Sequence, residues 1–290
     1  MALGIREWIA GLGKKADGSA QRVLDDAQRA FWEANGFLAL SGFMTPEEIA
    51  SVRAVVDDEW TRAPGNDHEV DVNSGPYAGR AYKMYEVDPS ARGECYKLNN
   101  LFGRRAEIRR VALTPRLKQA CAELLEGEPL ICNSLNFERG SQQEYHIDTW
   151  YMPPPGEGRM VVASIAIDDV DAGNGPVAYY AGSHKIPPYR FSDGRLNEIP
   201  SEKPDCRAYL DREIAARGLQ EQEFHGKSGD VLLWHAQLLH AGRPIREIDR
   251  TRSSLVVHYW RRQDLPRGHV RIDPAAGCYL AHTLRGEIRY

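Results

Sequence analysis

The sequence predicts a mainly β protein, in which a helical N-terminal third packs on a C-terminal β-barrel within one domain. After Gly127, short apolar segments alternate with turn residues, and Asn174-Gly175 is a strong tight-turn signal. Before Gly127, apolar residues recur at helical spacing behind sequences that favour helix starts. Many short strands separated by regular turns are typical of a sandwich or barrel.

The N-terminal third, residues 1–127, is expected to be mainly helical support. A helix is predicted over 21–35, ended by Gly36, and a short strand over 37–40. Thr45-Pro46-Glu47-Glu48 has the features of a helix start, with Thr45 as N-cap and Glu48 closing a capping box. Thr114-Pro115 opens a further helix. Residues 63–80, rich in Gly, Pro, Asn and Asp, are expected to form a loop.

The β core is expected over residues 128–262. Its predicted strands are 129–137, 143–151, 159–168, 176–180, 230–235, 237–240 and 252–260. Residues 185–222 are too polar and too rich in proline for core strands, and we expect this insert to cover one mouth of the barrel. Residues 263–290 are a C-terminal extension. Because barrels often reach this length as one unit, residues 1–290 are predicted to be a single domain.

The composition excludes several classes of protein. Of the 290 residues, 42% are hydrophobic and 27% charged, and the net charge is −4 at pH 7, which gives no case for nucleic-acid binding. Five cysteines without CxxC spacing argue against a disulfide framework and a zinc site. No apolar run approaches the about 20 residues that span a membrane. We therefore expect a cytoplasmic protein whose partner is a small-molecule substrate.

The segment His146-Ile147-Asp148 is the candidate metal site. On an extended strand, side chains two residues apart point to the same face, so one imidazole and one carboxylate can reach a single ion. A third ligand is expected from His240, which precedes the small residues Ala241 and Gly242, rather than from its rival His235. Two histidines and one carboxylate with open positions form the facial arrangement of non-heme Fe(II) oxygenases. The alternatives are a surface hydrogen-bonded pair for His-x-Asp and a core histidine for the third residue.

Arg252 is the candidate clamp for a carboxylate. It opens the predicted strand 252–260, where its side chain shares a face with Ser254. A buried guanidinium must be paired, and arginine binds a carboxylate with two parallel hydrogen bonds. The alternative is an internal salt bridge. Arg246 and Arg250 are rivals, but both lie in a polar turn.

Taken together, these residues resemble the phytanoyl-CoA dioxygenase family of Fe(II)- and 2-oxoglutarate-dependent oxygenases. The resemblance runs in order from about residue 25 to 262. It is carried by 31–38, the helix at Thr45, His146-Ile147-Asp148, Asn174-Gly175-Pro176, Gly182-Ser183-His184-Lys185, Gly229-Asp230, His240-Ala241-Gly242 and Arg252.

The resemblance implies a double-stranded β-helix, of the jelly-roll or cupin-like kind, flanked by helices. It implies that His146, Asp148 and His240 hold iron, that Arg252 grips the far carboxylate of 2-oxoglutarate, and that Ser254 is a candidate contact for this co-substrate. With O2, the co-substrate would give succinate and carbon dioxide while the substrate is oxidised. Halogenases of the family replace the carboxylate ligand by a small residue, so Asp148 favours hydroxylation.

Aromatic residues next to Asp148 are candidates for the substrate pocket. We expect Trp150 and Tyr151 to line it, although aromatic residues at strand spacing more often pack in a core. The basic stretch Arg261, Arg262, Arg267 and Arg271 is either a solvated face or an attraction for an anionic substrate such as an acyl thioester.

Three functions are open at this point. The first is a 2-oxoglutarate-dependent dioxygenase that hydroxylates a small molecule, with secondary-metabolite intermediates among the candidate substrates. The second is a non-catalytic β-barrel ligand-binding module with a vestigial metal site. The third is a cupin-like metalloenzyme that needs no co-substrate. The presence of the full set His146, Asp148, His240 and Arg252 favours the first, because a binding module needs neither a chelating triad nor a carboxylate clamp.

Overall fold

The computed structural model describes residues 22–280. Within that range the helices are α1 (Asp26–Asn35), α2 (Pro46–Thr61), α3 (Ala106–Ala112), α4 (Pro115–Leu125) and α5 (Lys203–Arg217). Helix α2 begins as expected, because Thr45 and Glu48 form the predicted capping box. Asp25 and Gln28 form a second capping box at α1, so this helix starts later than the predicted residue 21.

The main sheet has ten strands. Its path is β1 (Phe37–Leu40), β9 (Val231–His235), β6 (Met160–Ala166), β11 (Ser254–Arg261), β5 (Pro129–Phe137), β4 (Tyr96–Asn99), β2 (Glu69–Val72) and β3 (Ala81–Lys83). The hairpin of β12 (Val270–Asp273) and β13 (Gly277–Leu280) joins it through β13, which pairs in parallel with β5. All other pairings are antiparallel.

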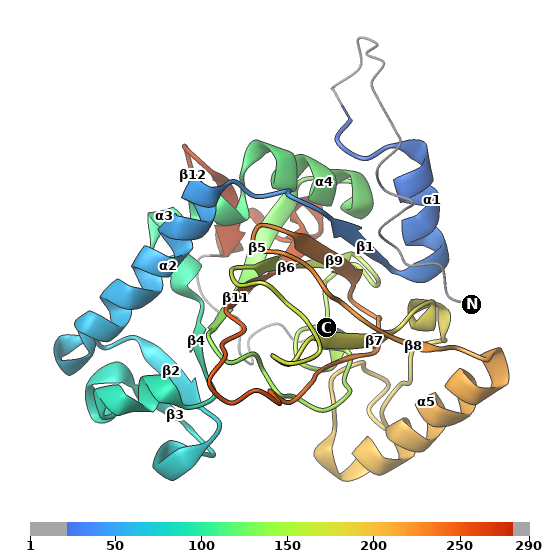
Figure 1. Cartoon of the computed structure of the whole chain (residues 1–290). Helices are drawn as coiled ribbons and strands as arrows, with labels where there is room; N and C mark the ends of the chain where they lie inside the picture. The colour runs from blue at the N-terminus through green and yellow to red at the C-terminus, as the bar shows by residue number, and fades with distance from the viewer. Residues whose placement is uncertain (1–21, 281–290) are drawn as a thin grey trace.

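A minor sheet completes the barrel. It has the order β10 (His240–Gly242), β7 (Val177–Tyr180) and β8 (Glu221–Glu223), all antiparallel. Figure 1 shows α2, α3 and α4 on one side of the main sheet and α5 on the far side, next to β7 and β8.

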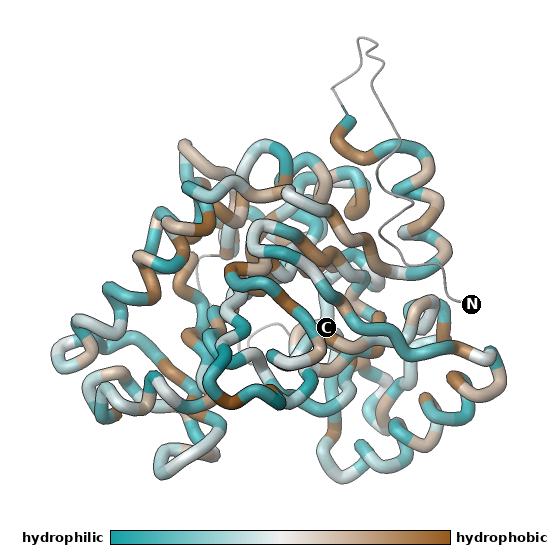
Figure 2. Tube along the Cα trace, viewed as in Figure 1, coloured by the Kyte–Doolittle hydropathy of each residue, from teal (hydrophilic) through white to brown (hydrophobic). Residues whose placement is uncertain are grey.

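The two faces of the main sheet bury different cores. On β11, Leu255, Val257 and Tyr259 pack with the helices, whereas Val256 and Trp260 pack toward the minor sheet. This alternation follows from the pleat of a strand. Figure 2 shows the apolar stretches gathered at the centre of the molecule and hydrophilic stretches on most outer loops. The inner face is therefore the one that can line a site.

The structure differs from the sequence expectations in the N-terminal third. The loop expected over 63–80 contains β2, and β3 and β4 extend the main sheet, so this third supplies strands as well as helices. These strands are three or four residues long, too short for a period-2 pattern to stand out. The insert 185–222 contains α5, whose apolar residues Cys206 and Leu210 are its only buried ones.

None of the helices formed by residues 22–280 has both the length and the apolar character that a membrane crossing requires. All five cysteines fall in this range, where they are buried and free of disulfides.

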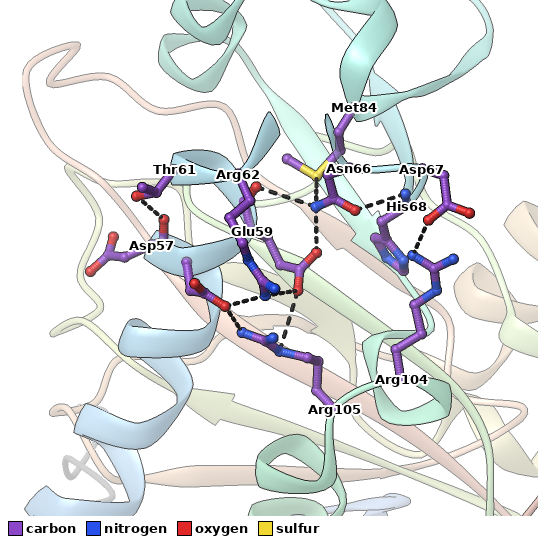
Figure 3. Close-up of polar contacts among 11 residues, drawn as sticks. Asp57, Glu59, Thr61, Arg62, Asn66, Asp67, His68, Met84, Arg104 and Arg105 are labelled. Atoms are coloured by element: carbon purple, nitrogen blue, oxygen red, sulfur yellow. Dashed lines mark hydrogen bonds and ion pairs between the residues drawn. The ribbon is translucent and has the colours of Figure 1, made fainter. Parts of the chain in front are cut away.

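A buried carboxylate fastens α2 to the neighbouring loops. Glu59 is 3% exposed, accepts a hydrogen bond of 2.6 Å from the Asn66 amide and lies 3.2 Å from Nε of Arg105. Arg62, one turn along the helix, approaches it to 3.7 Å. Figure 3 shows Glu59 at the centre of these contacts, with Asn66 above it and Arg105 below. The cluster ties the end of α2 to the loops before β2 and α3.

Replacing Glu59 by alanine should lower the free energy of unfolding by about 2–3 kcal/mol, because Arg105 and Asn66 lose a buried partner. Urea denaturation measures this change. The control is Glu213→Ala on α5, whose partner Arg217 lies four residues away and is largely exposed, and whose loss should cost less than about 0.5 kcal/mol. Equal effects of the two substitutions would contradict a stabilising role for the Glu59 cluster.

Candidate metal centre

Three predicted site residues converge on the inner side of the barrel. His146, Asp148 and His240 each offer a ligand atom, and these atoms all lie within 4.8 Å of one another. Nε2 of His146 is 3.9 Å from Oδ1 of Asp148, and Nε2 of His240 is 3.8 Å from Oδ2. All three residues are buried. This group could hold a metal ion.

A single antiparallel bridge brings the two histidines together. The amide of His146 donates to the carbonyl of His240 at 2.9 Å, and the reverse bond is 3.0 Å. The strand expected over 143–151 is wrong, because the segment is extended only around this bridge and then enters the 3-10 turn η7 (Asp148–Trp150). Asp148 therefore reaches the site from a turn rather than from a strand.

Backbone carbonyls fix how both imidazoles face the centre. Nδ1 of His146 lies 2.7 Å from the carbonyl of Glu144, and Nδ1 of His240 lies 2.9 Å from that of Leu238. A carbonyl only accepts hydrogen bonds, so each Nδ1 carries the proton. Each Nε2 then presents a lone pair toward Asp148. Two lone pairs and a carboxylate at one point suit a divalent cation and match the two-histidine, one-carboxylate set.

The titration behaviour follows from burial. Burial, reinforced by the neighbouring His240, lowers the pKa of His146 to about 3. Burial alone would raise the pKa of Asp148, but His240 and His258 beside it hold that pKa below its usual value. Near neutral pH the site therefore presents a neutral His146 and an ionised Asp148, which is the state that binds metal.

His235, the rival of His240, lies outside this group. Its Nδ1 accepts a hydrogen bond of 3.1 Å from the amide of Gln237, and its ring stands 5.4 Å from that of His184. Burial lowers its pKa to about 4. The structure thus places His235 in the protein's own packing, as the sequence interpretation expected.

Arg252 is buried in the wall of the same cavity. It is 4% exposed, and no acidic side chain among residues 22–280 forms an ion pair with it. Burial lowers its pKa to about 10. The backbone of Gly140 packs on its guanidinium so closely that a Cβ there would lie 2.2 Å from Nη2. An internal salt bridge, the alternative from sequence, is therefore absent from this part of the chain.

The rivals of Arg252 lie in the turn before β11. Arg246 is exposed, and Arg250 pairs with Asp171 at 2.8 Å and with Glu247 at 3.0 Å. Neither borders the cavity. Ser254 is buried, and its hydroxyl has no hydrogen-bond partner in residues 22–280, but it is not among the residues that line the cavity.

The cavity has a volume of about 710 Å³. Besides the three candidate ligands and Arg252, its wall contains Trp150 and Tyr151. Tyr151 is 45% exposed and so stands at the mouth, whereas Trp150 also packs against the apolar residues of the insert. The insert adds Arg195, Asn197 and Glu198 to the wall, in agreement with a segment that covers one mouth.

Two residues next to Asp148 were not identified from the sequence. Nε1 of Trp234 donates a hydrogen bond of 2.7 Å to Oδ2, and Nε2 of His258 lies 3.4 Å from Oδ1. Trp234 lies within the predicted strand 230–235, and nothing in the sequence distinguishes it from a core residue there. His258 lies six residues after Arg252 in the predicted strand 252–260, so the two share a face, and this position is its one sequence signal.

Comparison with known proteins gives the family of the chain and supports its fold. The family described as "Phytanoyl-CoA dioxygenase (PhyH)" matches residues 32–252. Among curated proteins, no sequence matches the chain. The chain is similar to three solved structures in particular. SnoK, a non-heme alpha ketoglutarate dependent carbocyclase from nogalamycin biosynthesis, has a TM-score of 0.62 at 17% identity, covering 84% of this chain and 88% of SnoK.

The second is EctD from S. alaskensis with 2-oxoglutarate and 5-hydroxyectoine, with a TM-score of 0.62 at 17% identity, covering 86% of this chain and 80% of EctD. The third is the epimerase SnoN in complex with Fe3+, alpha ketoglutarate and nogalamycin RO. It has a TM-score of 0.58 at 18% identity, covering 88% of this chain and 94% of SnoN. Together with the two facing sheets, these likenesses confirm the predicted double-stranded β-helix flanked by helices.

Acidification should destabilise the metal-free protein. An unfolded histidine titrates near pH 6.5, whereas His146 in the fold has a pKa of about 3, so the unfolded chain takes up the proton first as the pH falls. This contribution to stability is complete above about pH 6.5 and is lost between there and about pH 3. His235, with a pKa of about 4, adds to it in the same sense.

Urea unfolding measured between about pH 7 and pH 4 tests this. In His146→Gln the slope of the unfolding free energy should fall by up to about 1.4 kcal/mol per pH unit, which is one proton. An unchanged slope would show that His146 is not held neutral in the fold.

Proposed function

The chain belongs to the phytanoyl-CoA dioxygenase family, and from that premise we propose that it is a non-heme Fe(II), 2-oxoglutarate-dependent dioxygenase that hydroxylates an unactivated C–H bond of a small molecule. The family predicted from the sequence is thereby confirmed, and with it the enzyme class. The assignment of individual residues, the hydroxylation and the substrate are the proposal.

One observation carries the proposal: a triad of two histidines and one carboxylate shares a cavity with an arginine that has no acidic partner in residues 22–280. We assign His146, Asp148 and His240 as the iron ligands. An unpaired buried guanidinium is costly, and a ligand carboxylate removes that cost through charge-assisted hydrogen bonds. Arg252 is therefore assigned to the carboxylate of 2-oxoglutarate that lies away from the metal.

Iron(II) bound with 2-oxoglutarate and O2 supplies an oxidant for the C–H bond, while the co-substrate becomes succinate and carbon dioxide. The residues of the chain orient the groups that take part in this chemistry. Glu144 and Leu238 hold both imidazoles in the tautomer that leaves Nε2 free. Arg252 orients the co-substrate, and Trp150 and Tyr151 are assigned to bound substrate on the open side of the cavity.

The retained carboxylate Asp148 favours hydroxylation over halogenation. The similar structures are named for other oxidative outcomes too, since SnoK is called a carbocyclase and SnoN an epimerase. Two of the three come from nogalamycin biosynthesis or hold a nogalamycin compound, which supports a secondary-metabolite intermediate as the substrate of this chain.

The charges around the cavity favour an uncharged substrate. Apart from Arg252, the cationic side chains of its wall are Lys97 and Arg195. Lys97 pairs with Asp71 at 3.2 Å, and Arg195 is half-exposed and 4.0 Å from Asp193. The C-terminal arginines are not part of the wall, and Arg261 pairs with Asp264 at 2.8 Å. Because Arg252 is assigned to 2-oxoglutarate, an acyl thioester with several phosphates would find no further free cation in this wall.

Anaerobic addition of 2-oxoglutarate to the Fe(II) protein should give the weak visible charge-transfer band of a chelated co-substrate. In Arg252→Ala the concentration needed for half of this band should rise about 30- to 150-fold, the equivalent of 2–3 kcal/mol for a lost bidentate contact. Arg195→Ala, which changes another arginine of the same wall, is the control and should leave that concentration within about twofold.

Asp148→Ala should bind neither iron nor co-substrate. A wild-type protein that holds iron but gives no band would instead indicate the metalloenzyme that needs no co-substrate. A wild-type protein that binds no iron would indicate the non-catalytic module.

A panel of small molecules can be screened for succinate release above the background measured without substrate. Neutral compounds should give the largest release. With such a substrate, Tyr151→Ala and Trp150→Ala should lose coupled oxidation while keeping iron binding and uncoupled turnover. Tyr85→Ala, an equally exposed tyrosine outside the cavity wall, is the control. Unchanged coupling in both cavity variants would remove these residues from the substrate pocket.

A further inference from the structure

We propose that Trp234 and His258 are positioning residues that hold the carboxylate of Asp148 in one orientation toward the metal. This inference rests on the proposed function, because it concerns the same centre. It assigns a role to two residues that are not themselves in the group of candidate ligands.

The two side chains stand on either side of one residue of the main sheet. Val162 on β6 is paired with Trp234 on β9 and with His258 on β11, so all three belong to one row across the inner face. Trp234 and His258 are almost fully buried, at 3% and 2% exposure. The side chains of Trp234 and His258 both direct an N–H group to Asp148.

Each oxygen of Asp148 meets one of these groups. The indole N–H of Trp234 bonds to Oδ2 at 2.7 Å, which is a short and strong contact. Nε2 of His258 is 3.4 Å from Oδ1. A lone pair on that nitrogen would face an anionic oxygen, so the proton lies on Nε2. Nδ1 of His258 has no hydrogen-bond partner among residues 22–280, which agrees with this tautomer.

The consequence concerns coordination. Asp148 stands on the turn η7, so no strand pairing fixes its side chain, and these two hydrogen bonds take over that function. A carboxylate whose two oxygens each accept an N–H cannot turn without losing a buried bond, so the two bonds fix which lone pairs face the ion. Loss of either bond would free the carboxylate to turn and bind through both oxygens, which would take a position that the co-substrate or O2 needs.

The chain offers a matched control for the tryptophan. Trp260 lies two residues after His258 on β11, is 4% exposed and lines the same cavity. Its Nε1 has no hydrogen-bond partner among residues 22–280. Trp234→Phe and Trp260→Phe therefore remove the same atoms from the same cavity, but only the first removes a contact to Asp148.

The first readout is metal binding without co-substrate, measured with Co(II) and Fe(II) in competition with a chelator. Trp234→Phe should raise the dissociation constant of the metal about 10-fold or more, which is the usual effect of removing a hydrogen bond to a metal-ligating side chain. Trp260→Phe should leave the dissociation constant within about twofold of the wild-type value. His258→Leu should weaken binding similarly. His258→Gln should restore much of it, because the Gln amide can donate from nearly the same position.

The second readout is the visible spectrum of the Co(II) protein, which reports coordination number. Trp234→Phe should change this spectrum, and Trp260→Phe should not. Equal metal affinities for Trp234→Phe and Trp260→Phe, together with no difference between His258→Leu and His258→Gln, would overturn the inference. Since these measurements need no 2-oxoglutarate, failure of the proposed function would appear separately, as a missing charge-transfer band in wild-type protein that binds metal.

Discussion

The site depends on two backbone hydrogen bonds between His146 and His240. They form a lone antiparallel bridge between segments far apart in the sequence and put both imidazoles on the inner side of the barrel. Each ring then donates its Nδ1 proton to a carbonyl two residues earlier, so ring orientation follows from the backbone. A shift of one residue in this register would turn a ring to the opposite face. The positions of the two histidines in the candidate metal centre therefore follow from the pairing of the backbone at this bridge.

The cavity contains one buried anion and one buried cation that do not pair with each other. Asp148 is compensated by the N–H groups of Trp234 and His258. Arg252 has no acidic partner among residues 22–280, although burial disfavours its charge enough to lower its pKa to about 10. An acidic partner for this guanidinium, or an apolar residue in its place, would make the protein more stable. Arg252 therefore lacks an anionic partner, and the proposed co-substrate brings a carboxylate to the same cavity.

Much of this arrangement could be predicted from the sequence, because the relevant signals are local. The cap at Thr45, the strands around β5, β6 and β11 and the His-x-Asp spacing all depend on a few neighbouring residues. The turn at Asp148 could not be predicted, since an extended pair and a bridge followed by a 3-10 turn have the same side-chain pattern. The role of Trp234 was hidden for another reason. Its indole ring fits an apolar strand equally well with or without a partner for Nε1, and only the pairing of β9 with β6 brings it to Asp148.

The insert 185–222 shows how a polar segment gains a defined place at the mouth of the cavity. The insert bonds to both sides of the segment that carries the candidate ligands His146 and Asp148. The backbone amide of Glu198 donates to the carbonyl of Trp150 at 3.0 Å, and the guanidinium of Arg207 donates to the carbonyl of Tyr145 at 3.3 Å. Tyr145 directly precedes His146, and Trp150 ends the turn that begins at Asp148. The sheets thus position the end of the cavity that contains the candidate ligands. The insert and residues 145–150 form the mouth. Changes in the insert can therefore alter which molecule enters without altering the bridge that positions the histidines.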